Sequence, residues 1–326
     1  MSQKKIIITG ALGFIGSCLV SKLNSLGYNN LVLVDDFSKP GEKLNNIEGK
    51  IYLDKVGIFE LPVWIKEHGD EVGFVFHIGG NSSTVETNKD IFDRYNTEYT
   101  RDLWNLCTAL HIPFVFTSSA ATYGDGSLGY SDKHDLIPLL KPLNLYGESK
   151  AIFDTWAIKQ ENTPPLWAGL KPFNVYGPNE YHKGRMASVI MHFYNQIKDN
   201  GQITLFRSHR PEYVDGGQMR DFIYIKDILD IYVHFLNPNI TSGIYNAGTG
   251  QARTYLDLAR TIFKVLNKEE NITFIDTPLD IREKYQYFTE ADTKKLREVS
   301  LHNKKMTSLE DGIEDYVGYL KFHKYL

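Results

Sequence analysis

The chain has 326 residues, a formal net charge of −4 and 42% hydrophobic residues, proportions typical of a globular protein in water. The small negative charge gives no electrostatic reason to expect nucleic acid or an anionic membrane as a partner. No apolar run approaches the ~18 residues of a membrane-spanning helix, and the N-terminus shows no secretion signal. The length suits two closely packed lobes.

The first half of the chain alternates short apolar strands with helical segments. We predict helices over residues 14–26 and 91–110, and strands over 5–9, 31–34, 74–77 and 113–117. Strands that are apolar throughout, rather than alternating, are typical of a parallel sheet covered on both faces. The fold class is therefore α/β, a doubly wound parallel sheet of the Rossmann type.

A glycine-rich loop, residues 10–16, joins the first strand to the first helix. Gly10 permits a tight turn, Gly13 lets the backbone approach a pyrophosphate, and Gly16 allows the helix to pack closely on the strand. The N-terminus of the helix stabilises the bound anion. This loop predicts a dinucleotide cofactor.

Asp35 ends the second strand, where a carboxylate binds the hydroxyl groups of the adenosine ribose. Electrostatics alone favour NAD here, because the carboxylate repels a 2′-phosphate. Lys39, Lys43 and Lys55 are near enough in sequence to compensate for that repulsion.

Tyr146 and Lys150 form a Y-x-x-x-K pair downstream of Ser118-Ser119. Residues four apart on a helix share one face. We expect the Lys150 ammonium to lower the pKa of the Tyr146 phenol toward neutrality, which makes the phenol a proton acceptor for an alcohol. Together with the glycine loop, the pair indicates a nicotinamide-dependent enzyme that acts on a secondary alcohol.

The second half is less regular. We expect a strand over 166–170, short strands near Thr204, Ile244 and Thr273, and helices over 186–198, 226–236, 255–266 and 309–322. Residues 1–170 are assigned to the dinucleotide-binding domain and residues 171–326 mainly to a smaller mixed α/β substrate lobe, with the chain crossing back between lobes. Cys18 and Cys107 are predicted to be buried free thiols in helices, and no metal site is expected.

The chain resembles the extended short-chain dehydrogenases/reductases, and within them the ADP-glycero-manno-heptose 6-epimerases. The resemblance covers nearly the whole chain. It is carried by residues 9–10, 13–16, His77, 82–84, 118–124, 143–147, Lys150, 173–178, 182–184, 186–188, 220–224, 246–250, 285–286, 288–289 and 291–292. Several of these strings are shared by many nucleotide-sugar epimerases and dehydratases. The His182-Lys183-Gly184 segment with Met186-Ala187-Ser188 is the specific one.

The resemblance implies inversion of C6 in the heptose of ADP-D-glycero-β-D-manno-heptose by transient oxidation. Inversion exposes both faces of a ketone, so each face needs its own acid/base group. The resemblance assigns these roles to Tyr146 and Lys183, while Ser119 binds the reacting hydroxyl and Lys150 orients the nicotinamide ribose. A surface position or a phosphate contact is the alternative for Lys183.

The resemblance also implies two sets of binding residues. The cofactor set is Gly10, Gly13, Phe14, Ile15, Gly16, Asp35, Asp36, Lys43, Lys55, Ile78, Gly79, Gly80, Asn81, Ser82, Asn96, Lys150 and Val175. The substrate set is Ser119, Asn174, Lys183, Arg185, His192, Phe206, Arg220 and Tyr285. A guanidinium fork such as that of Arg220 suits a diphosphate, although an ion pair with Asp221 is an alternative. His77 is expected to be structural.

The family generally uses NADP, and Lys43 and Lys55 match its phosphate-binding lysines, so NADP is the expected cofactor with NAD as the alternative. A cytoplasmic homo-oligomer, a pentamer by family resemblance, is implied, supplying heptose for the lipopolysaccharide core. The chain departs from the family pattern at Asp36, at Arg185 and in a loop over 209–218 that looks longer than usual.

Other functions remain open on the residues alone. A UDP-hexose 4-epimerase, a GDP-heptose enzyme or a nucleotide-sugar dehydratase would share most of the motifs. A dehydratase usually carries an acidic residue where Ala121-Thr122 stands. A catalytically silent dinucleotide sensor or scaffold typically loses the tyrosine or the lysine of the pair, and both are present here.

Overall fold

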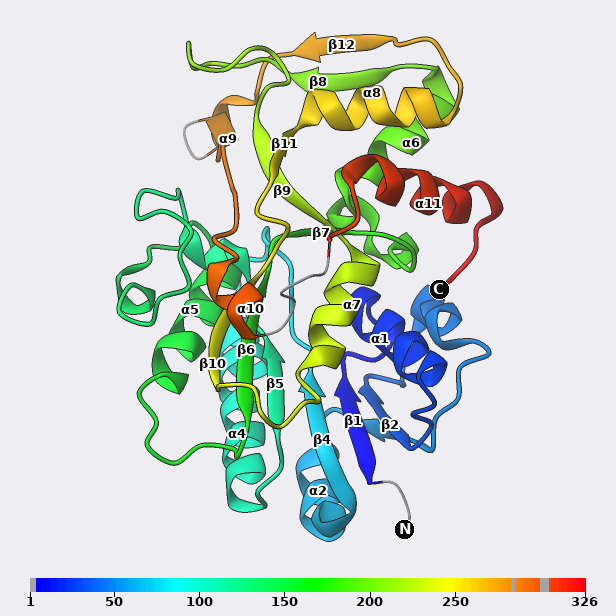
Figure 1. Ribbon diagram of the computed structural model, residues 1–326. Helices are drawn as coiled ribbons and strands as arrows, with labels where there is room; N and C mark the ends of the chain where they lie inside the picture. Colours follow the sequence, from blue (N-terminus) through cyan, green and yellow to red (C-terminus); the bar gives the residue numbers. More distant parts are fainter. Residues whose placement is uncertain (1–3, 283–284, 300–304) are drawn as a thin grey trace.

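The computed structural model describes residues 4–282, 285–299 and 305–326. A seven-stranded sheet dominates the larger lobe, with strand order β10-β6-β5-β4-β1-β2-β3 and parallel pairing throughout (Figure 1). Its strands are β1 (Lys5–Thr9), β2 (Leu31–Asp35), β3 (Asp54–Gly57), β4 (Val72–His77), β5 (Phe114–Thr117), β6 (Trp167–Pro172) and β10 (Gly243–Ala247). This confirms the doubly wound sheet that the apolar strands predict.

Helices cover both faces of this sheet, and each face has its own apolar core. The helices of this lobe are α1 (Phe14–Ser25), α2 (Leu61–His68), α3 (Lys89–Phe92), α4 (Tyr99–Ala109), α5 (Leu145–Ala157) and α7 (Ile225–His234). On one face, Trp104 of α4 is fully buried and packs edge-on against Phe114, Phe116 and Trp167 of the strands. Edge-to-face contacts of this kind add to the free energy of burial.

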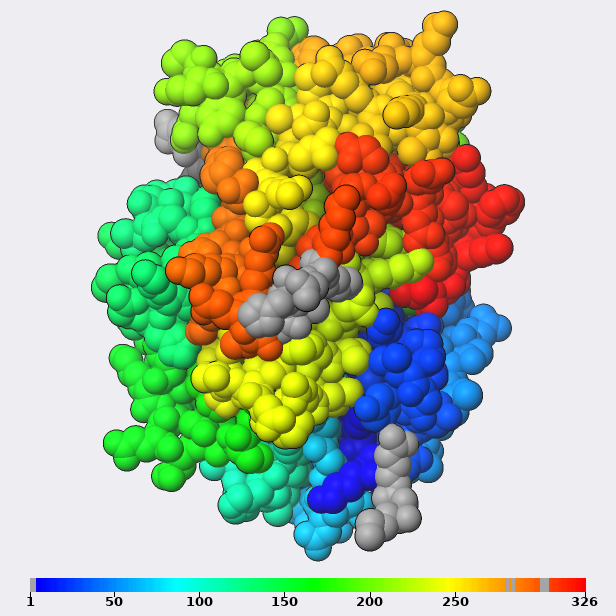
Figure 2. Space-filling model, viewed as in Figure 1, coloured from blue at the N-terminus to red at the C-terminus, as the bar shows by residue number. Residues whose placement is uncertain are grey.

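The smaller lobe holds a three-stranded sheet, β11-β9-β7, and a two-stranded sheet, β12-β8. These strands are β7 (Asn174–Tyr176), β8 (Ile203–Phe206), β9 (Met219–Tyr224), β11 (Ala252–Thr254) and β12 (Ile272–Ile275). Its helices are α6 (Val189–Asn200), α8 (Tyr255–Val265), α9 (Leu279–Arg282) and α11 (Leu309–Phe322), whereas α10 (Lys294–Val299) packs against β10 of the large sheet. β10 returns to the large sheet, and in Figure 2 the yellow-to-red final third of the chain runs over both lobes.

Several short segments connect these elements. They are the 3₁₀ segments η1 (Gly41–Ile47), η2 (Gly69–Glu71), η4 (Ala120–Tyr123), η5 (Ile137–Leu139) and η6 (Tyr181–Met186), and the π-helical turn η3 (Asp93–Glu98). Among the described residues, none of the helices combines the length and the apolar character that a membrane crossing requires. Within the same residues, no group of three or more His, Cys, Asp or Glu side chains could hold a metal ion.

Some predicted boundaries are wrong. The helix expected over 91–110 is α3 and α4 joined by the π-helical turn η3. The helix expected from 186 begins at Val189, because residues 181–186 form η6, in which Gly184 has a φ of 51°. Strands β3, β7, β9 and β11 and helices α2, α9 and α10 are not predicted. Both cysteines are buried free thiols, in α1 and α4, as expected.

Candidate active site

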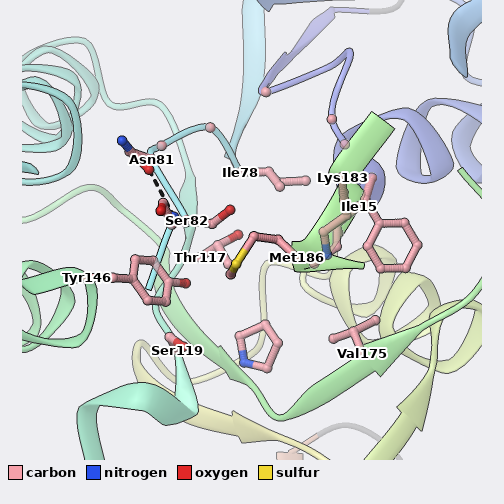
Figure 3. Close-up of a pocket in the computed structure, with 18 of the residues that line it drawn as sticks. Ile15, Ile78, Asn81, Ser82, Thr117, Ser119, Tyr146, Val175, Lys183 and Met186 are labelled. Carbon is pink, nitrogen blue, oxygen red and sulfur yellow. Dashed lines mark hydrogen bonds between the residues drawn. The ribbon is translucent and has the colours of Figure 1, made fainter. Parts of the chain in front are cut away.

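A cavity of about 840 Å³ lies at the carboxyl ends of β1 and β4. The strand order reverses between these two strands, which is where doubly wound sheets bind their ligands. The glycine loop, the end of β2, the 78–83 loop, the start of α5 and the segments around Asn174 and Lys183 all line it. Figure 3 shows Tyr146 and Lys183 on opposite sides of the cavity, with Met186 between them.

The glycine loop fits the phosphates of a dinucleotide. Gly10 has a φ of 66°, and a Cβ atom there would lie 2.7 Å from the Cα atom of Gly79. A Cβ atom on Gly16 would lie 2.1 Å from the Gly10 carbonyl oxygen. Gly13 precedes α1, whose first amides receive no side-chain cap. Such uncapped amides, at the positive end of the helix dipole, suit a pyrophosphate.

The acidic pair Asp35 and Asp36, at the end of β2, lines the same cavity. Asp35 Oδ2 accepts a hydrogen bond from the Leu12 amide at 2.9 Å, which fixes the carboxylate against the glycine loop. Asp36 Oδ1 accepts from the Ser38 amide and hydroxyl, and these bonds lower its pKa. Lys43 lines the cavity beside this pair.

Lys55, by contrast, is not among the cavity-lining residues. Its ammonium lies 5.6 Å from the ring centre of Phe37 and 5.2 Å from that of Tyr52. The structure therefore brings only one of the two predicted phosphate-binding lysines to the wall of the cavity.

Asn96 holds the 78–82 loop from behind. Its Oδ1 accepts from the Asn81 amide at 2.8 Å, and its Nδ2 donates to the Asn81 carbonyl at 2.9 Å and to Ser149 Oγ at 3.0 Å. Asn96 is buried within the π-helical turn η3 and is not among the residues lining the cavity. Its position is that of a support for the predicted cofactor loop.

Helix α5 carries Tyr146 and Lys150 into the cavity. Asn144 caps the helix by accepting from the Gly147 amide at 2.8 Å. A Cβ atom on Gly147 would lie 2.7 Å from the Ala121 carbonyl oxygen, so the missing side chain lets α5 approach the turn that follows Ser119. Tyr146, Lys150 and Ser119 all line the cavity, as predicted.

The expected lowering of the Tyr146 pKa is wrong for this arrangement. Burial raises the pKa of the phenol, a hydrogen bond with Ser119 lowers it less, and the charge of Asp154 raises it further. Lys150 donates instead to the Thr117 carbonyl at 2.7 Å, and burial lowers its own pKa to about 8. Burial has the largest effect on the phenol, because removal from water disfavours its charged form.

Lys183 reaches the cavity from η6 and lies against Phe14, with its ammonium 5.0 Å from the ring centre. The same ammonium is 3.6 Å from the Glu180 carboxylate, which is fully buried. Glu180 also accepts from the amides of Gly177 and Ser188, at 3.1 and 2.6 Å. One carboxylate therefore ties both ends of the segment that carries Lys183.

The predicted substrate residues fall into two groups. Asn174, Lys183 and Ser119 line the cavity, and so does Val175 of the cofactor set. Arg185, His192, Phe206, Arg220 and Tyr285 do not. Arg220 lies 5.6 Å from the ring centre of Tyr285, which meets Phe206 at 5.9 Å. These three form a separate cationic–aromatic group of the smaller lobe.

Arg185 is exposed, and its carbonyl lies 3.3 Å from His192 Nε2. His77 is buried and bonded to Thr9 Oγ1 and Thr100 Oγ1, at 2.7 and 2.9 Å, which fits its expected structural role. Sequence reasoning assigned no role to Asn46, Glu180, His182 or Met186, although His182 and Met186 stand in the most specific motif.

The fold and the cavity define a nicotinamide-dinucleotide enzyme of the doubly wound class. Comparison with family models agrees: residues 6–248 match the NAD dependent epimerase/dehydratase family, and the chain belongs to that family. The ADP-L-glycero-D-manno-heptose-6-epimerase of Fusobacterium nucleatum is 46% identical over 322 residues, covering 96% of each chain. The enzyme of that name from Nitratidesulfovibrio vulgaris is 46% identical over 315 residues, covering 95% of this chain and 96% of its own.

Solved structures are similar over the whole chain. The ADP-L-glycero-D-manno-heptose-6-epimerase of Helicobacter pylori has a TM-score of 0.81 and 25% identity, covering 98% of this chain and 96% of its own. The UDP-glucose 4-epimerase of Thermotoga maritima, with a TM-score of 0.80 and 21% identity, covers 98% of this chain and 99% of its own and shares the fold.

Proposed function

We propose that this chain inverts C6 of the heptose in ADP-D-glycero-β-D-manno-heptose to give the L-glycero epimer. The observation that supports this best is the placement of two acid/base side chains, Tyr146 and Lys183, on opposite sides of one cofactor cavity. The identity of 46% over nearly the full length to the two named heptose epimerases supports the choice of substrate.

The residues divide the work between the two faces of the C6 ketone. Tyr146 exchanges a proton with the oxygen of one epimer, and Ser119 is hydrogen-bonded to the phenol. Lys183 exchanges a proton with the oxygen of the other epimer after the carbonyl has turned. A nicotinamide bound there would supply reversible hydride transfer. Because the two epimers present their oxygens on opposite faces, a base on each side of the cavity serves better than one base alone.

Separate sets of residues bind the cofactor and the substrate. The glycine loop, Asp35 and the 78–82 loop hold the dinucleotide, and Asn96 supports that loop from behind. Arg220, Phe206 and Tyr285 hold the ADP moiety, because a guanidinium suits a diphosphate and aromatic rings suit a base. We further propose NADP as the cofactor, since Lys43 lines the cavity together with Asp35 and Asp36 and lies close enough to Asp36 to affect its pKa. A cytoplasmic homo-oligomer serving lipopolysaccharide core synthesis completes the proposal.

The test is direct. The purified chain is incubated with ADP-D-glycero-β-D-manno-heptose, and separately with UDP-glucose and GDP-heptose, and the sugars are followed by NMR. We expect inversion at C6 of the ADP-heptose alone, with no net consumption of cofactor. Turnover of UDP-glucose at C4, with the ADP-heptose unchanged, would contradict the proposal and favour an ordinary 4-epimerase.

A further inference from the structure

Asn46 joins the glycine loop to the segment that carries Lys183. This side chain is 1% exposed. Its Nδ2 donates to the Leu12 carbonyl of the glycine loop at 2.8 Å and lies 3.4 Å from the Asn179 carbonyl. The same nitrogen is 3.2 Å from Nδ1 of His182. One buried amide therefore contacts the cofactor loop and the residue directly before Lys183.

The two carbonyl contacts of Asn46 bear on which ring nitrogen of His182 carries the proton. Only the amide nitrogen of Asn46 can face carbonyl oxygens favourably, so the group facing His182 is a donor. The amide has two N–H hydrogens for these three acceptors, and its contact with His182 Nδ1 at 3.2 Å is shorter than that with the Asn179 carbonyl at 3.4 Å. We therefore assign the acceptor role to Nδ1, and a neutral ring then carries its proton on Nε2. Within residues 4–282, 285–299 and 305–326, no hydrogen bond reaches His182 Nε2.

The surroundings of this ring are cationic. His182 lines the cavity together with Lys43 and Lys183. Burial and the charges of these two lysines lower the pKa of His182 to about 4, so the ring is neutral at neutral pH. Glu180, the nearest described carboxylate to Lys183, is bound to the amides of Gly177 and Ser188. Two ammonium groups beside a free N–H donor suit a phosphate, which offers several acceptor oxygens.

We propose that His182 donates its Nε2–H to a phosphate group of the bound dinucleotide, beside Lys43. The inference rests on the proposed cofactor but not on the proposed sugar. A phosphate held by His182 fixes residues 181–186, and with them Lys183. Cofactor binding therefore positions the second acid/base group. Asn46 is a positioning residue, because it sets which nitrogen of the ring carries the proton.

The cofactor offers two phosphate sources, the 2′-phosphate of NADP and the pyrophosphate that NADP and NAD share. Affinity for each dinucleotide is measured by calorimetry on the full chain, for the wild type, His182→Phe and His182→Gln. His68→Phe is the matched control, since His68 stacks on Trp64 at the end of α2 and is not among the cavity-lining residues. Phenylalanine keeps an aromatic ring but has no N–H donor, whereas glutamine keeps an amide N–H donor.

We expect His182→Phe to weaken binding about tenfold or more, because a hydrogen bond to a charged acceptor is lost. His182→Gln should bind within about threefold of the wild type, and the control should be unchanged. Weakening confined to NADP identifies the 2′-phosphate, and equal weakening for both identifies the pyrophosphate. No weakening with either, or no saturable binding by the wild type, overturns the inference.

Two further measurements separate the explanations. ¹⁵N NMR of the imidazole should show a neutral ring protonated at Nε2, and Asn46→Asp should abolish that form, since a carboxylate cannot donate. A ring protonated at Nδ1 in the wild type contradicts the inference. If the binding results hold while ADP-heptose is not epimerised, the proposed reaction fails and this inference stands. If epimerisation occurs and His182→Phe binds both dinucleotides normally, the proposed reaction stands and this inference fails.

Discussion

Asp154 Oδ2 lies 2.5 Å from Lys171 Nζ, and neither side chain is exposed. The carboxylate also accepts from Ser118 Oγ at 2.6 Å, and the ammonium donates to Thr122 Oγ1 at 2.7 Å. This ion pair lies directly behind the cavity: Asp154 raises the pKa of both Tyr146 and Lys150. A buried pair of this kind shapes the electrostatics of the site while contributing little net stability.

Breaking this pair should cost more than replacing it. Asp154→Leu leaves the Lys171 ammonium buried without its counter-ion, and we expect the free energy of unfolding to fall by roughly 3–5 kcal/mol. The double variant Asp154→Leu/Lys171→Met removes both charges and should recover most of that loss. Urea unfolding of the three proteins measures the difference. Additive losses in the double variant would show that the two side chains act independently.

Removal of either proposed base should stop epimerisation but leave one face active. We expect Tyr146→Phe and Lys183→Met each to lower the rate of inversion by about 10²–10⁴. Each variant should still dismutate a 6-aldehyde analogue to alcohol and acid, because the remaining base serves its own face. The assay is NMR of the products. A normal inversion rate in Lys183→Met would leave Tyr146 as the single acid/base.

The two lysines predicted to bind a 2′-phosphate should differ in effect. Lys43 lines the cavity, whereas Lys55 lies against Phe37 and Tyr52. Lys43→Ala should weaken NADP relative to NAD by about tenfold or more, and Lys55→Ala by less. Calorimetric titration of both dinucleotides measures the ratio. Equal effects would mean that Lys55 swings into the site, and tighter NAD binding by the wild type would show that the acidic pair dominates.

His77 should make the fold sensitive to acid. Burial and the charge of Lys150 lower its pKa from 6.5 to about 3. Between these two values the unfolded chain binds a proton that the folded protein excludes, so stability falls as the pH drops below about 6.5. The slope from one group is roughly 1.4 kcal/mol per pH unit. Between pH 7 and pH 5, the free energy of unfolding measured with urea should fall by about 2 kcal/mol less in His77→Gln than in the wild type. An identical pH dependence in the variant would assign acid sensitivity to other groups.

The thiols of Cys18 and Cys107 should be unreactive in the folded protein. Both are buried, and burial raises the pKa of Cys18 to about 12 and that of Cys107 still further. A thiolate-specific reagent should label neither within minutes at neutral pH and both in urea, because the thiolate is the reactive form. The variant Cys107→Ser keeps a single thiol and should take up one label per chain in urea. Fast labelling of folded protein would reveal opening of α1 or α4.

Local patterns predicted every strand of the large sheet except β3, and the glycine loop, because each apolar strand and each required glycine is a local property of the sequence. Strands such as β9 and β11 could not be predicted, since they mix buried and polar residues and are defined by pairing with distant partners. The Tyr146 pKa failed for a similar reason: desolvation depends on what packs around the phenol, not on Lys150 alone. The contact between Asn46 and His182 spans 136 positions and has no local signal.

The π-helical turn η3 has a consequence for insertions and deletions. Each residue of an α-helix advances the chain by about 100° around the helix axis. The wide turn at Asp93–Glu98 lets Asn96 face the 78–82 loop while Leu103 and Trp104 face the sheet. Deleting one residue there would yield a more regular helix that can satisfy only one of those two orientations. The length of this turn, and not only its composition, therefore positions Asn96 behind the 78–82 loop.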